Sequence, residues 1–271
     1  LTEPVIASAL PQEAAVHPTG FESYETVFTE ADRSEHAHLL TQVTNDRPVK
    51  VMTRQCIEKN EATNQWWVTV LGHDCPGELS MICGLLFAYG FDIAEGFVWT
   101  EIRPRAEGGR DHSPNNFVDV FKVRSNVEVF PAAWQRYEDD LNELVLMARS
   151  GRADDAQGLL VKRVADAIDG TPDLASRPAP LEVRFDNERH PRATVLTIRG
   201  DDTMGFLYEL ANALTLSGVS IEQVAVRAEG NRVLDTLLVT DAVSGGKIVD
   251  AARLQELQAA VVLIKHFTHL I

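Results

Sequence analysis

The chain has 271 residues, 45% of them apolar and 24% charged, a composition typical of a soluble globular protein with one large core or two small ones. Its formal net charge of −15 argues against a nucleic-acid partner and an anionic membrane surface, because phosphate contacts need clustered Lys and Arg. No apolar run or leader is long enough for a membrane segment, and three cysteines without metal-ligand spacing favour the reducing cytoplasm, with no metal or cofactor.

The N-terminal region is expected to be a mobile tail followed by a helix. Residues 1–29 lack hydrophobic periodicity and contain several prolines, whereas residues 30–46 read as helical. His36 and His38 on that helix are expected to face solvent. Leu1 in place of an initiating Met, and the apolar final residues, lead us to expect a fragment of a longer chain.

A repeated sequence organises the rest of the chain. The matching blocks are Trp67–Leu79 with Val195–Leu207, Gly90–Ile93 with Gly218–Ile221, Phe117–Val123 with Val233–Val239, and Arg47–Pro48 with Arg177–Pro178. The first two blocks keep a spacing of 128 residues and the third a spacing of 116, so the first copy carries 12 extra residues in the loop 103–116. We therefore predict two homologous domains, residues 47–149 and 177–271, joined by a helical linker at 150–176.

Both copies predict the same order of elements: strand, strand, helix, strand, strand, helix. Alternating apolar residues between turns indicate a hairpin, over 49–58 with the strand that follows, and over 181–187 with its own. Apolar positions at helical spacing follow, and the last helices are expected at 131–149 and 250–266. The hairpin strand before the helix can take an edge position, so we expect an α+β protein of two tandem ferredoxin-like units. Each is a circularly permuted ββαββα unit, and the two sheets join side by side.

The strand-to-helix blocks Gly72–Leu79 and Gly200–Leu207 resemble the signature of ACT domains. With Arg184–Glu188 and Leu234–Asp241, they make residues 47–271 similar to the C-terminal tandem ACT region of protein-PII uridylyltransferases. A related glutamine synthetase adenylyltransferase-type enzyme is the other parent that the resemblance allows. It implies a non-catalytic regulatory segment that senses an amino acid, glutamine in such enzymes, and controls an attached nucleotidyltransferase of nitrogen metabolism.

The glycine loops carry the predicted ligand site. Glycine lets the backbone approach a ligand closely, the N–H groups of a helix N-terminus suit a carboxylate, and Asp74 or Asp202 could accept from an amino group. The family often has Asn where Asp92 and Ser220 stand, and Pro where Met204 stands, so the amino acid recognised stays open. The expected ligand-binding residues are Gly72, His73, Asp74, Cys75, Pro76, Gly77, Asp92, Gly200, Asp202, Gly205 and Ser220.

Other interpretations of the same residues stay open. The loops could be helix entries that the fold alone requires, with Asp74 and Asp202 as helix caps. The chain could instead be a ligand-free module that forms a homodimer or docks a PII-like partner. A third hypothesis is a metal-dependent hydrolase built on His73 and Asp74, although no second His cluster has suitable spacing. Cys75 beside a helix N-terminus could be a nucleophile, but without a positioned base a structural thiol is favoured.

Overall fold

Alternating apolar side chains build one antiparallel sheet in this computed structural model, which describes residues 23–56, 64–100, 115–125, 129–169, 181–201, 203–229 and 232–267. The helices are α1 (Tyr24–Val27), α2 (Glu30–Leu40), α3 (Glu78–Ala88), α4 (Pro131–Arg149), α5 (Ala153–Asp169), α6 (Phe206–Leu216) and α7 (Ala251–Phe267). The strands are β1 (Val49–Gln55), β2 (Gln65–His73), β3 (Phe91–Thr100), β4 (Asn116–Ser125), β5 (Glu182–Asp186), β6 (Thr194–Asp201), β7 (Val219–Val226), β8 (Ala228–Glu229) and β9 (Arg232–Asp241).

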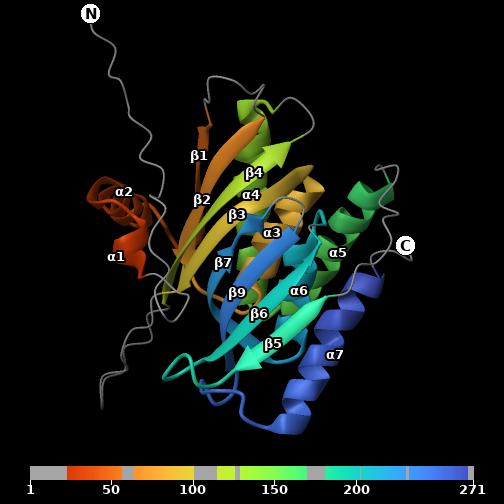
Figure 1. Ribbon diagram of the computed structural model, residues 1–271. Helices are drawn as coiled ribbons and strands as arrows, with labels where there is room; N and C mark the ends of the chain where they lie inside the picture. Colours follow the sequence, from red (N-terminus) through yellow and green to blue (C-terminus); the bar gives the residue numbers. More distant parts are fainter. Residues whose placement is uncertain are drawn as a thin grey trace, which may run out of the picture.

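Each copy of the repeat contributes strands in the predicted order. The sheet runs β1-β2-β4-β3-β7-β9-β6-β5, with the short β8 paired to β9 (Figure 1). The hairpin strands β1 and β5 therefore occupy its two edges, as the sequence predicts. The mixed α/β architecture and the joining of the two sets of strands into one sheet agree with the expectation from the sequence.

The two copies meet at a symmetrical strand pair. β3 pairs with β7 so that Gly96 faces Val226, Phe97 faces Ala225 and Val98 faces Val224. Ala225 is the counterpart of Phe97 at the spacing of 128 residues, and Val226 is likewise the counterpart of Val98. A local twofold axis therefore passes between Phe97 and Ala225, and the two copies contact each other through equivalent positions.

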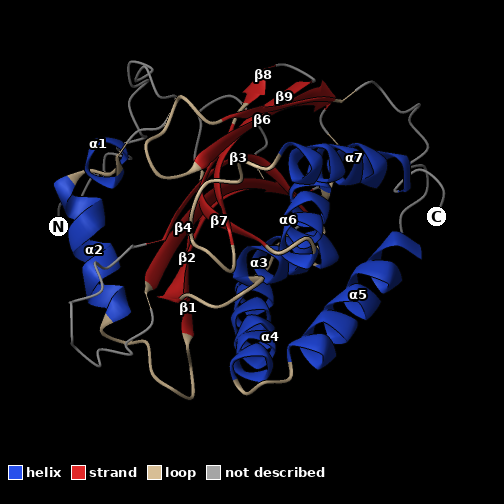
Figure 2. Cartoon of the chain, turned by 90° about the horizontal axis from the view of Figure 1, so that it is seen from below, coloured by secondary structure: helices blue, strands red, loops and turns tan. Residues whose placement is uncertain are grey.

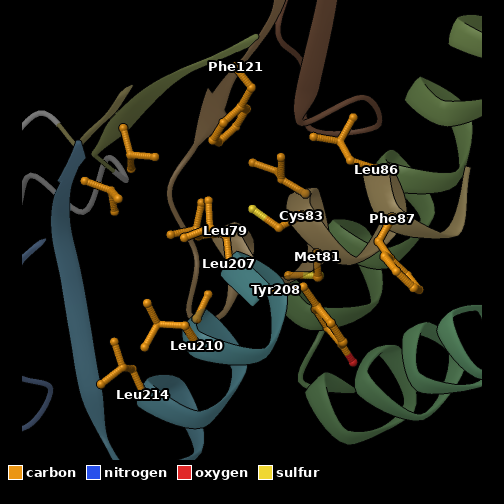
Figure 3. Close-up of a cluster of buried hydrophobic side chains, with 14 of the residues drawn as sticks. Leu79, Met81, Cys83, Leu86, Phe87, Phe121, Leu207, Tyr208, Leu210 and Leu214 are labelled. Carbon is orange, nitrogen blue, oxygen red and sulfur yellow. The ribbon is translucent and has the colours of Figure 1, made fainter. Parts of the chain in front are cut away.

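One hydrophobic core extends across both copies. Helices α3 to α7 cover one face of the sheet (Figure 2), and the core between them contains side chains from both repeats, among them Ile82, Leu86, Leu210 and Leu214. Figure 3 shows how side chains of α3 and α6 gather in it. Helix α5 closes this layer: a Cβ atom on Gly84 of α3 would lie 2.9 Å from Leu160 of α5.

The opposite face of the first repeat is covered by α1 and α2. Val27 of α1 and Phe28, which follows it, bury Leu71, Val118 and Val120 of the sheet. Residues 23–29 of the expected mobile tail are thus folded against the strands, while residues 1–22 lie outside the described residues. The predicted helix at 30–46 is shorter, ending at Leu40.

The expectation that His36 faces solvent is wrong. Its side chain is buried, its Nδ1 lies 2.6 Å from the Tyr24 hydroxyl, and its ring packs edge-on against Phe28. Burial lowers the pKa of His36 and raises that of Tyr24 to about 12, so the pair is neutral at pH 7. The sequence pattern missed this because α1 supplies the cover. His38 is exposed.

Candidate functional site

Both predicted glycine loops open a helix by the same backbone conformation. Gly77 and Gly205 are the residues before α3 and α6, with φ angles of 80° and 82°, and neither helix has a side-chain cap. Asp74 is therefore not the cap of α3, and that interpretation is wrong. Gly72 has a packing role: a Cβ atom there would lie 2.3 Å from the carbonyl oxygen of Pro48.

Each loop lies against the helix of the other repeat. A Cβ atom on Gly205 would lie 2.9 Å from the ring of Phe87, near the end of α3, and one on Gly77 would lie 3.5 Å from Thr215, near the end of α6. Phe87 and Thr215 occupy the same position in the two helices, at the spacing of 128 residues. The contact is thus reciprocal, and each predicted site is composed of both copies.

A small pocket lies beside the second loop. Its lining comes from α3, β3, the second loop with α6, and the strands behind them: Cys83, Phe87, Phe91, Asp92, Ile93, Thr203, Gly205, Phe206, Leu207, Tyr208, Val226, Val233 and Asp235. Figure 3 shows four of these side chains, Cys83 and Phe87 of α3 and Leu207 and Tyr208 of α6. Its volume is about 20 Å³, room for about one water molecule.

Asp92 belongs to this pocket. The sequence placed Asp92 with the first loop, in its own repeat, but here it lines a pocket together with Thr203 and Gly205 of the second. Its carboxylate also accepts a hydrogen bond of 2.7 Å from Arg124, which leaves it on the rim rather than in the core. Asp235 of β9 is almost fully buried. The pocket therefore combines the N-terminus of α6 with the buried Asp235 and, at its rim, with Asp92 of the other copy, whose carboxylate is paired with Arg124.

The first loop carries a cluster of buried acids. Glu78 begins α3 and Asp119 lies on β4; both are buried, and neither Asp119 oxygen nor Glu78 Oε2 has a hydrogen-bond partner of normal geometry. Burial raises the pKa of each well above its ordinary range, and the charge of Asp119 raises the Glu78 pKa further. Burial also raises the pKa of Asp74. The backbone N–H of Trp99 favours the charged form of Asp119, but less strongly than burial opposes it.

The remaining predicted residues of the first loop have structural surroundings. His73 Nδ1 lies 3.2 Å from the side-chain oxygen of Asn116, and the backbone N–H of Asp74 donates to Asn115 at 2.8 Å, so the loop is tied to the start of β4. Pro76 is exposed. Cys75 is buried, and burial raises the pKa of its thiol, which contradicts the nucleophile hypothesis.

In the second copy, Gly200 is buried on β6, where it pairs with Val233, and Ser220 is exposed on β7. Asp202 lies outside the described residues. The structure thus brings Gly205 and Asp92 together and leaves Ser220 at the surface.

Asp119 and Asp235 are the site residues that sequence reasoning missed. The signal was present, because both stand at the same place in the repeated block Phe117–Val123 and Val233–Val239. A carboxyl group in the middle of an apolar strand is costly to bury without a partner. The presence of an acid at this place in both copies could have identified Asp119 and Asp235 as candidate site residues.

Among the described residues, no group of three or more His, Cys, Asp or Glu side chains is arranged to hold a metal ion. The metal hydrolase hypothesis on His73 and Asp74 therefore gains no support. Of the helices in the described ranges, none has the length and apolar character needed to cross a membrane.

Comparison with curated proteins finds bifunctional uridylyltransferase/uridylyl-removing enzymes. That of Rhodospirillum rubrum is 26% identical over 256 residues, covering 89% of this chain and 24% of the relative. Those of Gluconobacter oxydans and Azospirillum brasilense are each 27% identical, covering 88% of this chain and 23% and 24% of the relatives. The chain thus spans about a quarter of the length of the curated relatives that it matches.

No protein-family model matches the chain. Among solved structures, an unknown protein from Galdieria sulphuraria covers 76% of this chain and 94% of its own length at 11% identity. Its TM-score of 0.22 is too low for the likeness to carry an argument.

Proposed function

We propose that this chain is an amino-acid-sensing regulatory module of two ACT-like units, and that it controls an attached uridylyltransferase. The observation that carries the proposal is the composite pocket, in which the glycine loop of one repeat meets Asp92 of the other. The strand order β1-β2-β4-β3, with the hairpin strand at the edge, is the order expected of a permuted ferredoxin-like unit and supports the ACT assignment.

The chemistry of the pocket suits a free α-amino acid. The α-carboxylate would lie at the N-terminus of α6, where backbone N–H groups point out of the helix beyond Gly205. The ammonium group would be held by Asp92, which would have to turn from its ion pair with Arg124, while Asp235 lines the same pocket. The two charges of the ligand would then be bound by different copies of the repeat.

Such a ligand requires the pocket to open. A volume of about 20 Å³ holds one water molecule, so an amino acid enters only if Phe87 and the second loop move apart. Since these belong to different repeats, binding is coupled to their relative position. A ligand that prefers the open arrangement shifts the population toward it, and this shift is the signal that an attached enzyme would receive.

The curated relatives suggest the enzyme that is regulated. Their common name describes a uridylyltransferase with uridylyl-removing activity, and this chain matches about a quarter of their length. We propose that glutamine is the effector and that the nucleotidyl transfer takes place in another part of the parent chain.

The test is thermal unfolding of the chain with each of the twenty amino acids at millimolar concentration. A ligand at about 100 times its Kd stabilises the native state by roughly 2.7 kcal/mol, a readily measured rise in the unfolding midpoint. Asp92→Asn should abolish the rise, whereas Asp155→Asn on the exposed start of α5 should keep it. Asp74→Asn, measured in the same assay, shows whether the first glycine loop also takes part in ligand binding.

If no amino acid moves the midpoint, the sensing proposal fails. The ligand-free docking module then becomes the better account of the chain. If an amino acid moves it and Asp92→Asn responds like the unsubstituted protein, the ligand is bound elsewhere.

A further inference from the structure

The two edge strands of the sheet, β1 and β5, differ in how their outward-pointing backbone groups are bonded. At β1, the outward-pointing backbone groups are occupied by side chains of α4: the N–H of Val49 donates to Asn142 at 3.0 Å, and the N–H of Val51 donates to Glu138 at 3.1 Å. The Asn142 amide in turn donates to the carbonyl of Val49 at 3.1 Å. The β1 edge is thereby closed to another strand.

The last helix of the second repeat lacks these groups. α7 matches α4 at a spacing of 120 residues, which aligns the buried Tyr137 and Leu141 with the buried Leu257 and Val261. At the same spacing, Glu138 and Asn142, which bond the β1 edge, change to Gln258 and Val262, and the neighbouring Asp139 and Glu143 change to Ala259 and Leu263. Each of these four charged or capping side chains of α4 is thus replaced by a neutral one in α7.

The β5 edge is correspondingly open. The register with β6 makes Val183 the counterpart of Val51, so its backbone N–H and C=O point away from the sheet. Within the described ranges, the contact on that side is a 3.4 Å hydrogen bond from Gln258 to the carbonyl of Val183. The neutral face of α7 lies next to this edge through Gln258, and Leu263 of the same helix is half-exposed.

We infer that the β5 edge, with the neutral face of α7, is the interface with a second copy of this chain. The strands pair antiparallel about Val183, continuing the sheet across a twofold axis. In this register Glu182 stands opposite Arg184 of the second copy, and Leu181 opposite Phe185. Glu182 and Arg184 are exposed and form an ion pair of 2.8 Å within the single chain. In the dimer, each would stand opposite a residue of the opposite charge.

The charge pattern gives the first test, measured by sedimentation equilibrium of the whole chain. The unsubstituted chain is expected to be a dimer. Arg184→Glu places two like-charged pairs across the axis and should raise the dimer dissociation constant at least about tenfold. The double exchange Glu182→Arg with Arg184→Glu restores opposite charges and should recover the dimer. If the double exchange stays as weak as the single one, the register is wrong.

The closed edge of β1 gives the second test. Gln258→Glu with Val262→Asn places the capping residues of α4 on α7, and should convert the dimer to a monomer with a native circular dichroism spectrum. Gln255→Glu on the same helix is the matched control and should leave the dimer intact. Sedimentation equilibrium covers a roughly hundredfold range of protein concentration. If the unsubstituted chain is still a monomer at the top of that range, the inference is overturned. So does a dimer that survives both Arg184→Glu and the edge-closing pair.

This inference is independent of ligand sensing, because the β5 edge and the pocket share no residue. A monomeric variant that still responds to an amino acid leaves the proposed function standing. A dimer without any such response leaves the interface standing.

Discussion

Two buried carboxyl groups, Asp119 on β4 and Glu78 at the start of α3, are the most unusual residues of the first repeat. Asp119 is fully buried without a hydrogen bond of normal geometry, and Glu78 lies near enough for its charge to matter. Burial penalises the charged form of both groups, so protonation stabilises the fold at this site. The first repeat therefore has a titrating element in its core.

Asp119→Asn should remove that pH dependence. The folded-state pKa of Asp119 is raised above its ordinary value of 3.8, so its contribution to stability is complete at lower pH and is lost as pH rises through the folded pKa. The Asn variant does not titrate, so its unfolding midpoint should match that of the unsubstituted protein below about pH 4 and exceed it increasingly as pH rises. The gain in the free energy of unfolding should be about 1.4 kcal/mol per unit of pKa shift. Thermal unfolding across this pH range measures it.

Asp139→Asn is the control of opposite sign. Its pKa is lowered by a hydrogen bond from Arg47, so its contribution is present at neutral pH and lost as pH falls. The effect should be small because the pair is exposed. A midpoint for Asp119→Asn that follows the unsubstituted protein at every pH would show that the carboxyl group does not titrate in the core.

Sequence alone located the glycines well, because Gly77 and Gly205 stand at a strand-to-helix junction that only a left-handed residue can make. It could not place Asp92, whose loop partner comes from the other repeat. Such a pairing depends on how β3 meets β7, and no local pattern encodes that. The burial of His36 was hidden for the same reason, because Tyr24 and Phe28 reach it only after the chain folds.

At the level of the elements, the start of α6 is fixed by a left-handed glycine pressed against a ring of the other copy. Gly205→Ala should cost roughly 1–2 kcal/mol for the backbone conformation and about 1–3 kcal/mol more for the contact with Phe87. Gly90→Ala, with a φ angle of 80° and open space around it, should show the backbone cost alone. Urea unfolding compares the two, and equal losses would mean that Phe87 moves aside freely.

Helix α5 stabilises the layer of helices through one row of side chains. Leu160→Ala removes a fully buried side chain from its contact with α3 and should destabilise the protein by about 2–5 kcal/mol. Val161→Ala alters the next residue, which is 47% exposed, and should change the free energy of unfolding by less than about 1 kcal/mol. Equal effects on the urea midpoint would place α5 outside the cooperative core.

The order of elements was predictable, because helical and strand periodicities differ and both copies repeat them. The short α1 was not, since four residues have too little local preference and are held by packing on Trp99. The capping of β1 by α4 was also invisible in sequence. It depends on residues about ninety positions apart meeting at an edge.

On the scale of the whole molecule, one sheet and one continuous core join the two repeats, so they should unfold together. The chain offers a direct check, because all four tryptophans, Trp66, Trp67, Trp99 and Trp134, lie in the first repeat. Tryptophan fluorescence reports that repeat alone, whereas far-ultraviolet circular dichroism reports both. The two urea curves should coincide. An earlier midpoint for either signal would mean that the joint at Phe97 and Ala225 does not couple them.

That joint also has a consequence for how the protein is made. The chain leaves the ribosome N-terminus first, so β3 is complete while the strand that will pair with Phe97 and Trp99 is still untranslated. Until α4, α5 and the second hairpin have followed, this apolar strand presents a bare edge. Two nascent chains on one messenger RNA would both expose this edge of β3, so the two edges could pair with each other. That pairing stops being available once β7 of the same chain has been synthesised and pairs with β3.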